Sequence, residues 1–419
     1  MGVKVKISRY YGYIKNTGVY LFASILSSLL SLLINPLLAA NLSPDDYGII
    51  GYYGGFSSLF QPLIGFFILD YFLRKYFVYS EVERINLRNI VVKLYFYFSG
   101  SIALLCFVIL CFYNYSNHVI VPTLPYATVF ILESYILVIY NLKLAEYKMA
   151  GESIKFLKLS VFYGVMIAIC SILLVVFLKL GAWGKMLASF LASFIIFIYC
   201  MGKYRPAFRC KIDKDVFFEI IKYASPLVLA GLLGFFSKGF DKVILERQGD
   251  LHILGIYSVG FSMACYLDTF ANAVKSTFQP DVYNALAEKN FRKLLKTMIV
   301  VISSVVIIVL IFLLLCPLLI KILFAGRYDA AIPYARVLSL SVITSTIYYQ
   351  ISQATYGSGL SNLTLINKII GTVLTIALYS VLIPLYGSIG AAWGVVLSYL
   401  IYALSNIILL MLNRNKFLK

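Results

Sequence analysis

The chain has 419 residues, of which 61% are apolar and only 13% are charged. Globular proteins carry about 45–50% apolar and about 25% charged residues. This composition therefore excludes an ordinary soluble domain, which could not cover so much apolar surface. The formal net charge of +18 is typical of nucleic-acid-binding domains among soluble proteins. Here we assign it to loops that meet anionic lipid headgroups, and we expect no nucleic-acid partner.

Apolar segments recur along the whole chain, and a bilayer-spanning helix needs about 20 such residues. They predict an all-α, polytopic membrane protein with about 12 transmembrane helices. The first segment is expected to remain as a helix rather than to be cleaved as a signal peptide. The expected spans are 17–40, 47–73, 90–113, 118–142, 156–178, 182–201, 220–245, 253–274, 297–323, 332–356, 363–386 and 388–412.

Positive charge is distributed unequally between the two sides of this arrangement. Most of the 36 Lys and Arg residues, among them Arg88, Lys143 and Lys203, fall in loops on the side of the N-terminus. The positive-inside rule assigns that side to the cytoplasm, and an even number of spans places both termini there. The cations expected on the opposite side are Lys179, Lys185, Arg247, Lys321, Arg327 and Arg336.

The chain also carries signs of an internal repeat. Its two tryptophans lie in Ala182-Trp183-Gly184 and Ala392-Trp393-Gly394, and Lys158 and Lys368 match at the same offset. Six helices per half give a parallel repeat, in which two lobes enclose a central cavity. We expect an N-terminal lobe at 1–201, a cytoplasmic linker at 202–219 and a C-terminal lobe at 220–419.

Charged residues inside a membrane are functional candidates because their burial costs free energy. Lys238, Asp241 and Lys242 in the seventh span are spaced to share one helix face, which Glu246 extends. One interpretation is a cationic patch on a cavity wall, with Asp241 holding the ammonium groups in place. The other is a self-neutralising group that reaches the outer interface. The surplus of positive charge slightly favours the cavity.

Further candidates lie at the ends of the second and eighth spans. Asp70 and Arg74 form an i, i+4 pair beside Lys75, which is either a cytoplasmic anchor or a mouth that binds phosphate. Lys275 and Gln279 occupy the corresponding position in the second half, with the same two interpretations.

Deep polar groups form another set of candidates. Glu133 and Asp268 can bind and release H⁺ or Na⁺ during transport, or can hydrogen-bond to a neighbouring helix. Asp70 joins them as a candidate for ion coupling. Asn35-Pro36 and Gln61-Pro62 place amides beside helix kinks, where a freed carbonyl group needs a partner.

Signatures of enzymes and cofactor sites are missing from the sequence. No GxxxxGK[ST] loop or CxxC pair occurs, and His118 and His252 stand far from any metal-binding pattern. We expect no catalytic residues, no metal and no cofactor. The connecting loops are too short to form a catalytic domain, so the pattern favours a transporter.

Several motifs, in order, resemble those of a known group. They are Leu42-Ser-Pro-Asp-Asp-Tyr-Gly48, Phe240-Asp241-Lys242, Phe278-Gln279-Pro280, Gly326-Arg-Tyr328-x-x-Ala331-x-Pro333 and Pro384-x-x-Gly387-x-x-Gly390-Ala-Ala392. Each motif is short, but together they extend over the whole chain. In this order they resemble the motifs of the polysaccharide-exporting branch of the multidrug/oligosaccharidyl-lipid/polysaccharide (MOP) exporter superfamily, and within it those of the Wzx-type O-unit flippases.

The resemblance implies a bacterial inner-membrane flippase with a cavity lined by spans 1, 2, 7 and 8. Its substrate is an undecaprenyl-diphosphate-linked oligosaccharide for O-antigen assembly, moved to the periplasmic leaflet by alternating access coupled to H⁺ or Na⁺. A polysaccharide polymerase and a chain-length regulator are candidate partners besides membrane lipids. The first span carries no charge, unlike that of some lipid II flippases, so lipid II is not the expected substrate.

Alternative functions remain open at this stage. A multidrug (MATE-like) antiporter of the same superfamily shares the fold but favours acids over cations within the membrane. A major-facilitator transporter also has two parallel halves, but its GxxxDRxGRR-like loop is absent. A polysaccharide polymerase needs a large outside loop that this chain lacks.

Overall fold

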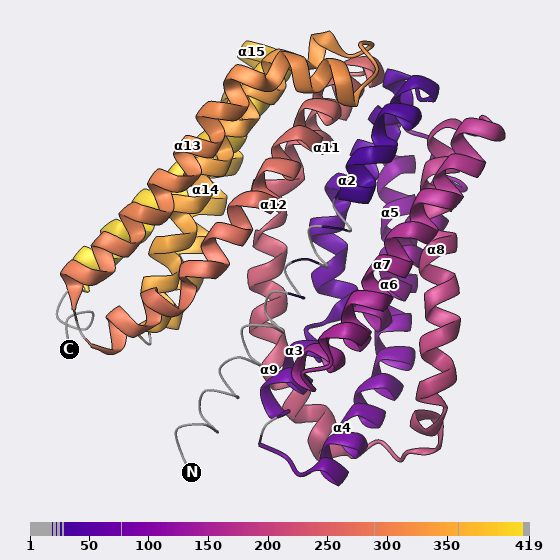
Figure 1. Ribbon diagram of the computed structural model, residues 1–419, viewed down its shortest axis with the longest axis vertical. Helices are drawn as coiled ribbons and strands as arrows, with labels where there is room; N and C mark the ends of the chain where they lie inside the picture. Colours follow the sequence, from indigo (N-terminus) through magenta and orange to yellow (C-terminus); the bar gives the residue numbers. More distant parts are fainter. Residues whose placement is uncertain are drawn as a thin grey trace. The chain divides into compact units, whose positions relative to one another are not determined.

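The computed structural model describes residues 19, 22, 26, 29–76, 78–288, 290–358 and 360–413. All regular structure in these residues is helical (Figure 1), which confirms the all-α prediction. By length and composition, nine of the described helices can cross a membrane, or ten if the bent pair α2 (Pro44–Gly65) and α3 (Ile68–Lys75) is one span. The described part of the expected first span forms the apolar helix Leu29–Asn41, and the count of twelve stays a prediction.

The described residues divide into two compact units. Unit 1 contains those up to Leu42 together with Phe60–Leu229, and unit 2 contains Ser43–Leu59 together with those from Ala230 onward. The first turns of α2 therefore belong to unit 2 and its last turns to unit 1. The predicted lobes at 1–201 and 220–419, with their linker at 202–219, stay predictions.

Unit 1 is a helical bundle around an aromatic core. The ring of Tyr95 stacks on that of Tyr135 with centroids 4.8 Å apart. Ser80 and Glu83 form a capping box at the start of α4, with Ser80 Oγ donating to the Glu83 carboxylate at 2.7 Å. After α3, the elements are α4 (Glu81–Leu94), η1 (Tyr95–Ser99), α5 (Gly100–Ser116), α6 (Tyr126–Met149), α7 (Ser153–Ser171), η2 (Ile172–Phe177), α8 (Gly181–Tyr204), η3 (Arg205–Arg209) and most of α9 (Lys214–Leu233).

Unit 2 contains the longest helices of the chain. Its last element is divided at Gly387, whose φ of 60° interrupts the helical backbone, as the PxxGxxGAA turn predicts. After the end of α9, the elements are α10 (Phe235–Lys238), α11 (Phe240–Glu246), α12 (Leu251–Ala287), α13 (Phe291–Leu323), η4 (Asp329–Ala331), α14 (Ile332–Gly357) and α15 (Ser361–Leu412).

The seventh span differs from its prediction. A single helix was expected over 220–245, but the structure divides this segment into α9, α10 and α11, with breaks at Gly234 and Gly239. Gly239 has φ −146° and ψ −20°, which lies outside the helical region. Apolar periodicity shows that the segment crosses the membrane, but it does not show where a glycine interrupts the helix.

The outer surfaces of the helices are apolar. In α13, an 18-residue window has a mean hydropathy of 3.5, yet only 28% of it is buried inside the protein. Leu314 on this helix is 81% exposed. So continuous an apolar surface is unfavourable in water but is stable in contact with lipid. The chain is therefore a multi-pass membrane protein.

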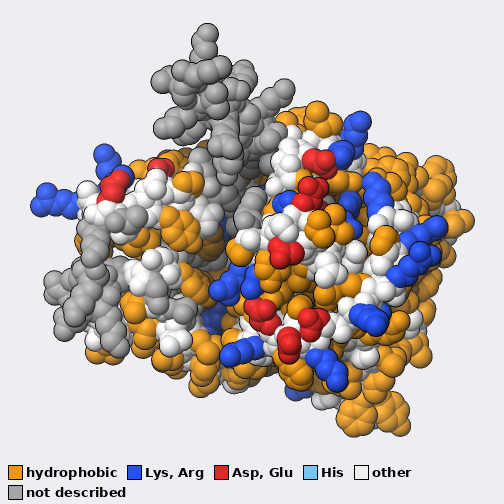
Figure 2. Space-filling view, turned by 90° about the horizontal axis from the view of Figure 1, so that it is seen from below, with side chains coloured by type: hydrophobic (Ala, Val, Ile, Leu, Met, Phe, Trp, Pro, Cys, Tyr) orange, Lys and Arg blue, Asp and Glu red, His pale blue; other side chains and the backbone are white. Residues whose placement is uncertain are grey.

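Charged side chains gather at one end of unit 1. Figure 2 shows Lys and Arg side chains, with acidic ones among them, on the face seen from below. At this end α3, α4 and α9 come together (Figure 1). It is the end that the charge distribution predicts to be cytoplasmic.

Candidate functional site

A buried ion pair lies at the start of α11 in unit 2. Asp241 is fully buried, and its Oδ2 atom lies 3.5 Å from Lys242 Nζ. The hydroxyl group of Tyr257 on α12 donates a 2.6 Å hydrogen bond to the same oxygen. The other carboxylate oxygen, Oδ1, is buried and has no hydrogen-bond partner in the described residues. A buried, incompletely bonded carboxylate costs about 1–3 kcal/mol, so this arrangement needs a reason other than stability.

Lys242 is held by an aromatic ring as well as by the carboxylate. Its Nζ atom lies 3.2 Å from the centroid of Phe261 and 6.0 Å from that of Tyr257. Such cation–π contacts stabilise a desolvated ammonium group by about 2 kcal/mol. At so low an exposure, a cation interacts more strongly with an anion than it does in water.

Lys238 is not part of this arrangement. We expected Lys238, Asp241 and Lys242 to share one helix face, which is wrong because the helix is interrupted at Gly239. Lys238 is exposed, whereas Asp241, Lys242 and Glu246 are buried. The surplus of positive charge therefore does not come from two adjacent buried lysines on a continuous helix.

The first turns of α2 cover this ion pair within unit 2. A Cβ atom at Gly55 would lie 3.0 Å from the carbonyl oxygen of Gly239 and 3.4 Å from Lys242 Cβ. The rings of Phe56 and Phe235 stack beside this contact, 5.9 Å apart. Since only glycines permit so close an approach of two backbones, the segment Ser43–Leu59 lies directly on Lys242.

The LSPxxYG turn anchors that covering segment. The ring of Tyr47 packs edge-on against those of Phe324 and Tyr328, at centroid distances of 5.9 and 5.2 Å. Tyr328 belongs to the GxxYxxA motif before α14, so this contact joins two of the motifs that were recognised separately. Asp46 caps the turn by accepting hydrogen bonds from the Ser43 backbone N–H and Oγ, both at 2.8 Å.

A second ion pair lies further along α12. Lys275 is buried, and its Nζ atom lies 3.2 Å from Asp268 Oδ1 and 5.3 Å from the ring centroid of Tyr349. Asn272 donates to the other oxygen of Asp268 at 3.2 Å. The structure thus joins a cation candidate with an ion-coupling candidate, while Gln279 is half-buried one turn further along.

The charges at the end of the second span do not pair as expected. The Asp70–Arg74 pair is absent among the described residues: Asp70 is exposed, and the Arg74 guanidinium group lies over the ring of Tyr223 at 5.2 Å. Lys75 pairs instead with Glu219 of α9 at 2.8 Å. The i, i+4 spacing would allow Asp70 and Arg74 to pair, but Arg74 and Lys75 both contact residues of α9 instead.

Glu133 and Lys185 lie near each other inside unit 1. Glu133 on α6 interacts electrostatically with Lys185 on α8, and Lys185 donates to Ser171 Oγ at 3.2 Å. Lys185 was expected on the outside, near the start of the span 182–201, and it lies near the start of α8. Its proximity to Glu133 was not predicted, because the two residues belong to different spans.

The two amides beside prolines have different surroundings. Asn35 is buried, and Gln61 is exposed next to Pro62. The backbone breaks only after Pro62, at Phe66 and Phe67, where positive φ angles accompany a 55° bend between α2 and α3. A kink in the second span is therefore present, a few residues beyond the proline.

Tyr257 and Phe261 are the residues of the ion-pair site that sequence reasoning missed. Both are aromatic residues within a predicted apolar span, where nothing in the sequence distinguishes them. They contact Asp241 and Lys242 because α12 packs against α11. The described residues contain no group of three or more His, Cys, Asp or Glu side chains that could hold a metal ion.

Residues 13–280 match a family model described as "Polysaccharide biosynthesis protein". The chain belongs to this family. One curated relative, "Lsg locus putative protein 1" of Haemophilus influenzae, is 24% identical over 282 residues, which are 66% of this chain and 67% of that protein. The resemblance drawn from the ordered motifs is confirmed.

Solved structures show that this polysaccharide biosynthesis protein has the MOP fold. An inward-facing multidrug resistance MATE family transporter of the MOP superfamily superposes with a TM-score of 0.71 at 14% identity, covering 95% of this chain and 97% of the other. The lipid II flippase MurJ in an inward closed conformation gives a TM-score of 0.66 at 15% identity, covering 97% and 89%. At such low identities these likenesses concern the fold, and the function is argued separately.

Proposed function

We propose that this chain is not an enzyme but a flippase. It moves an undecaprenyl-diphosphate-linked oligosaccharide from the cytoplasmic to the periplasmic leaflet for the assembly of a surface polysaccharide. The membership of a polysaccharide biosynthesis family supports the substrate class. The fold, which is shared with the lipid II flippase MurJ, is suited to such a step.

The observation that carries the proposal is the buried lysine on α11. A diphosphate that leaves the aqueous interface loses its hydration, and a cation in a low-dielectric setting replaces part of that stabilisation. Lys242 is 3% exposed and is balanced by a carboxylate that Tyr257 holds in place. When Ser43–Leu59 moves away from α11, this cation becomes accessible to the anionic headgroup, and Lys275 provides a second one on α12.

Direction is supplied in our proposal by H⁺ or Na⁺ coupled to alternating access. Glu133 lies near Lys185 in unit 1, and Asp268 forms an ion pair with Lys275 in unit 2. Protonation or Na⁺ binding at either carboxylate weakens its attraction to the neighbouring lysine. Ion binding at each of these carboxylates can therefore change the contacts between helices. Asp70 is the weaker candidate for the coupling ion, because it is exposed.

An H⁺- or Na⁺-coupled multidrug antiporter is the alternative, because a MATE transporter shares the fold at a TM-score of 0.71. Such a protein must bind organic cations, for which unpaired buried carboxylates are suited. In the described residues, Asp241 and Asp268 each have a lysine partner, an arrangement that favours an anionic headgroup.

The proposal is tested by deleting the gene in its source strain and making two measurements on the same cells. Surface polysaccharide is examined on gels, and extracted lipid-linked repeat units are examined by mass spectrometry. Loss of the polymer with accumulation of one lipid-linked unit is expected. Normal polymer with increased sensitivity to cationic drugs would instead assign the chain to the antiporters.

A further inference from the structure

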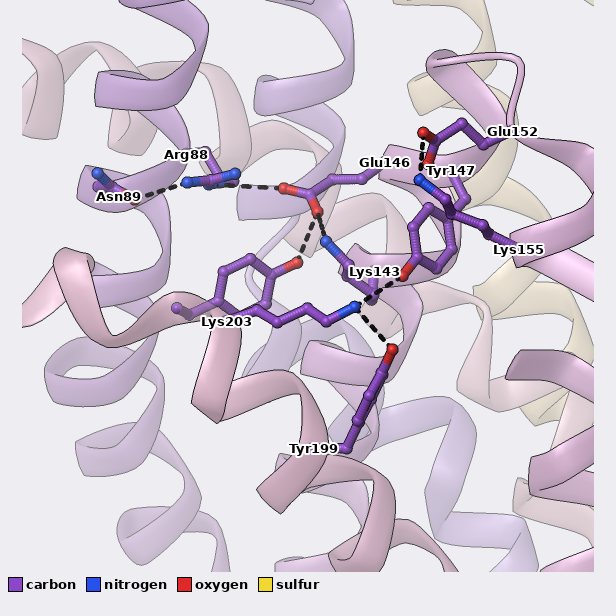
Figure 3. A network of polar contacts seen from close by, with 10 residues as sticks. Arg88, Asn89, Lys143, Glu146, Tyr147, Glu152, Lys155, Tyr199 and Lys203 are labelled. Carbon is purple, nitrogen blue, oxygen red and sulfur yellow. Dashed lines mark hydrogen bonds and ion pairs between the residues drawn. The ribbon is translucent and has the colours of Figure 1, made fainter. Parts of the chain in front are cut away.

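Unit 1 contains a charged cluster that the proposed transport step does not use (Figure 3). Glu146 on α6 is its centre: the carboxylate oxygen Oε2 accepts hydrogen bonds from Lys143 Nζ at 2.6 Å and from the Tyr204 hydroxyl group at 2.9 Å. Its Oε1 atom lies 3.7 Å from Arg88 Nε on α4. We call Arg88, Lys143, Glu146, Lys203 and Tyr204 the Glu146 cluster.

The Glu146 cluster holds more cations than its carboxylate can neutralise. Arg88 Nε is buried with no hydrogen-bond partner in the described residues, and its Nη2 atom donates to the neutral side chain of Asn89 at 3.3 Å. Within the described residues, Lys203 Nζ donates to phenolic oxygens alone, those of Tyr199 at 2.6 Å and Tyr147 at 3.4 Å. The cluster thus holds three cations and one carboxylate, which leaves two positive charges for an anion outside the chain.

The cations are pre-positioned by aromatic rings. The Arg88 guanidinium group lies over Tyr204 at 5.6 Å, and Lys203 Nζ lies over Tyr199 at 4.5 Å. Lys143 is buried, whereas Arg88 is partly exposed and Lys203 is exposed. The Lys143–Glu146 pair is therefore the inner support, and Arg88 and Lys203 form a rim that a ligand can reach.

The position of the cluster limits the kind of ligand. It lies where the last turns of α6 and α8 meet α4, at the end of unit 1 that the charge distribution predicts to be cytoplasmic. Apolar side chains such as Tyr199 and Ile198 on α8 are exposed nearby, as expected of a surface at the lipid interface. Basic pockets between membrane helices on this side are suited to anionic lipid headgroups.

We propose that the Glu146 cluster binds the phosphate group of an anionic phospholipid, such as phosphatidylglycerol, in the cytoplasmic leaflet. Arg88 contacts the phosphate through its fork of N–H donors, and Lys203 contributes a second charge. The lipid would tie α4 to α6 and α8 and so stabilise unit 1. The inference is independent of the transported substrate, because every residue that carries it lies outside the ion-pair site on α11.

The test uses the full chain purified in detergent, with retained lipid counted by native mass spectrometry. Dioleoyl phosphatidylglycerol is titrated in, and dioleoyl phosphatidylcholine is the zwitterionic reference. The double variant Arg88→Gln/Lys203→Gln is expected to retain phosphatidylglycerol about 25-fold less well, because each of the two cations near the membrane surface contributes about fivefold. Lys155→Gln is the matched control, since Lys155 is exposed and already forms an ion pair with Glu152 at 2.6 Å.

Two further arms decide the outcome. If the double variant does not fold, Lys203→Gln alone is measured, since Lys203 is exposed and its partners in the described chain are two phenols. An approximately fivefold loss is then expected. Equal retention by these variants and by Lys155→Gln would overturn the proposal, which would leave the cluster a purely structural charge network. Displacement of phosphatidylglycerol by a lower concentration of undecaprenyl phosphate would also overturn it and assign the cluster to the transported lipid.

Discussion

Tyr257 donates a 2.6 Å hydrogen bond to the same carboxylate oxygen of Asp241 that Lys242 approaches at 3.5 Å. The hydroxyl group and the ammonium group therefore share one oxygen, while the other oxygen has no hydrogen-bond partner in the described chain. Because Tyr257 keeps its hydrogen bond to Asp241 when Lys242 turns to an incoming anion, the carboxylate is not left without a partner.

Replacing Lys242 with methionine is expected to reduce surface polymer at least about tenfold in complementation of the deletion strain, a loss of about 1.4 kcal/mol or more in the interaction with the headgroup. Lys242→Arg keeps the charge and is expected to retain most of the activity. Lys238→Met is the control, since Lys238 is exposed beyond the break at Gly239. Equal losses in both methionine variants would contradict a special role of the buried lysine.

Removing the hydroxyl group in Tyr257→Phe is expected to lower stability by about 1.5–3 kcal/mol, because the hydrogen bond has a charged acceptor and is buried. Thermal unfolding in detergent measures this effect. Tyr334→Phe serves for comparison, as its hydroxyl group bonds to that of Ser388 at 2.7 Å between neutral groups, and a loss of about 0.5–1.5 kcal/mol is expected there. The same midpoint for both variants would show that Asp241 does not depend on Tyr257.

Gly55→Val is expected to abolish complementation, since the added side chain would push α2 away from Gly239 and Lys242. Gly54→Val is a closely matched control on the same helix, because a Cβ atom at Gly54 meets nothing within 4 Å. Both changes carry the same helix propensity, so their difference isolates the close contact. Activity of the Gly55 variant at the level of the Gly54 variant would mean that Ser43–Leu59 need not lie on α11.

The sequence was sufficient for the fold class because lipid imposes long apolar helices. It placed the broken turn at Gly387 correctly, since PxxGxxGAA interrupts a helix locally. It failed at Gly239, where the break accompanies the approach of Gly55, a residue far away in the chain. Local patterns therefore predict local interruptions and miss those that a tertiary contact requires.

The charged sites were predictable in part for the same reason. Asp241 and Lys242 are adjacent in sequence, and their buried pair was visible as a motif. The Glu146 cluster was missed because its members come from α4, α6 and α8. Sequence reasoning counted Arg88, Lys143 and Lys203 among loop charges, and only the packed helices show that Lys143 is buried.

The last prediction concerns Glu133, whose neighbour Lys185 is fixed by Ser171. If Glu133 binds the coupling ion, Glu133→Gln removes the site, and transport of a fluorescent lipid-linked substrate in proteoliposomes no longer responds to an imposed H⁺ or Na⁺ gradient. Glu133→Gln also leaves the charge of Lys185 without its acidic neighbour, so Glu133→Gln/Lys185→Met is measured alongside to restore charge balance. Asp268→Asn distinguishes the two candidate carboxylates, because it removes the partner of Lys275 in unit 2. A gradient response that survives in the Glu133 variants and disappears in Asp268→Asn would transfer ion coupling from unit 1 to α12.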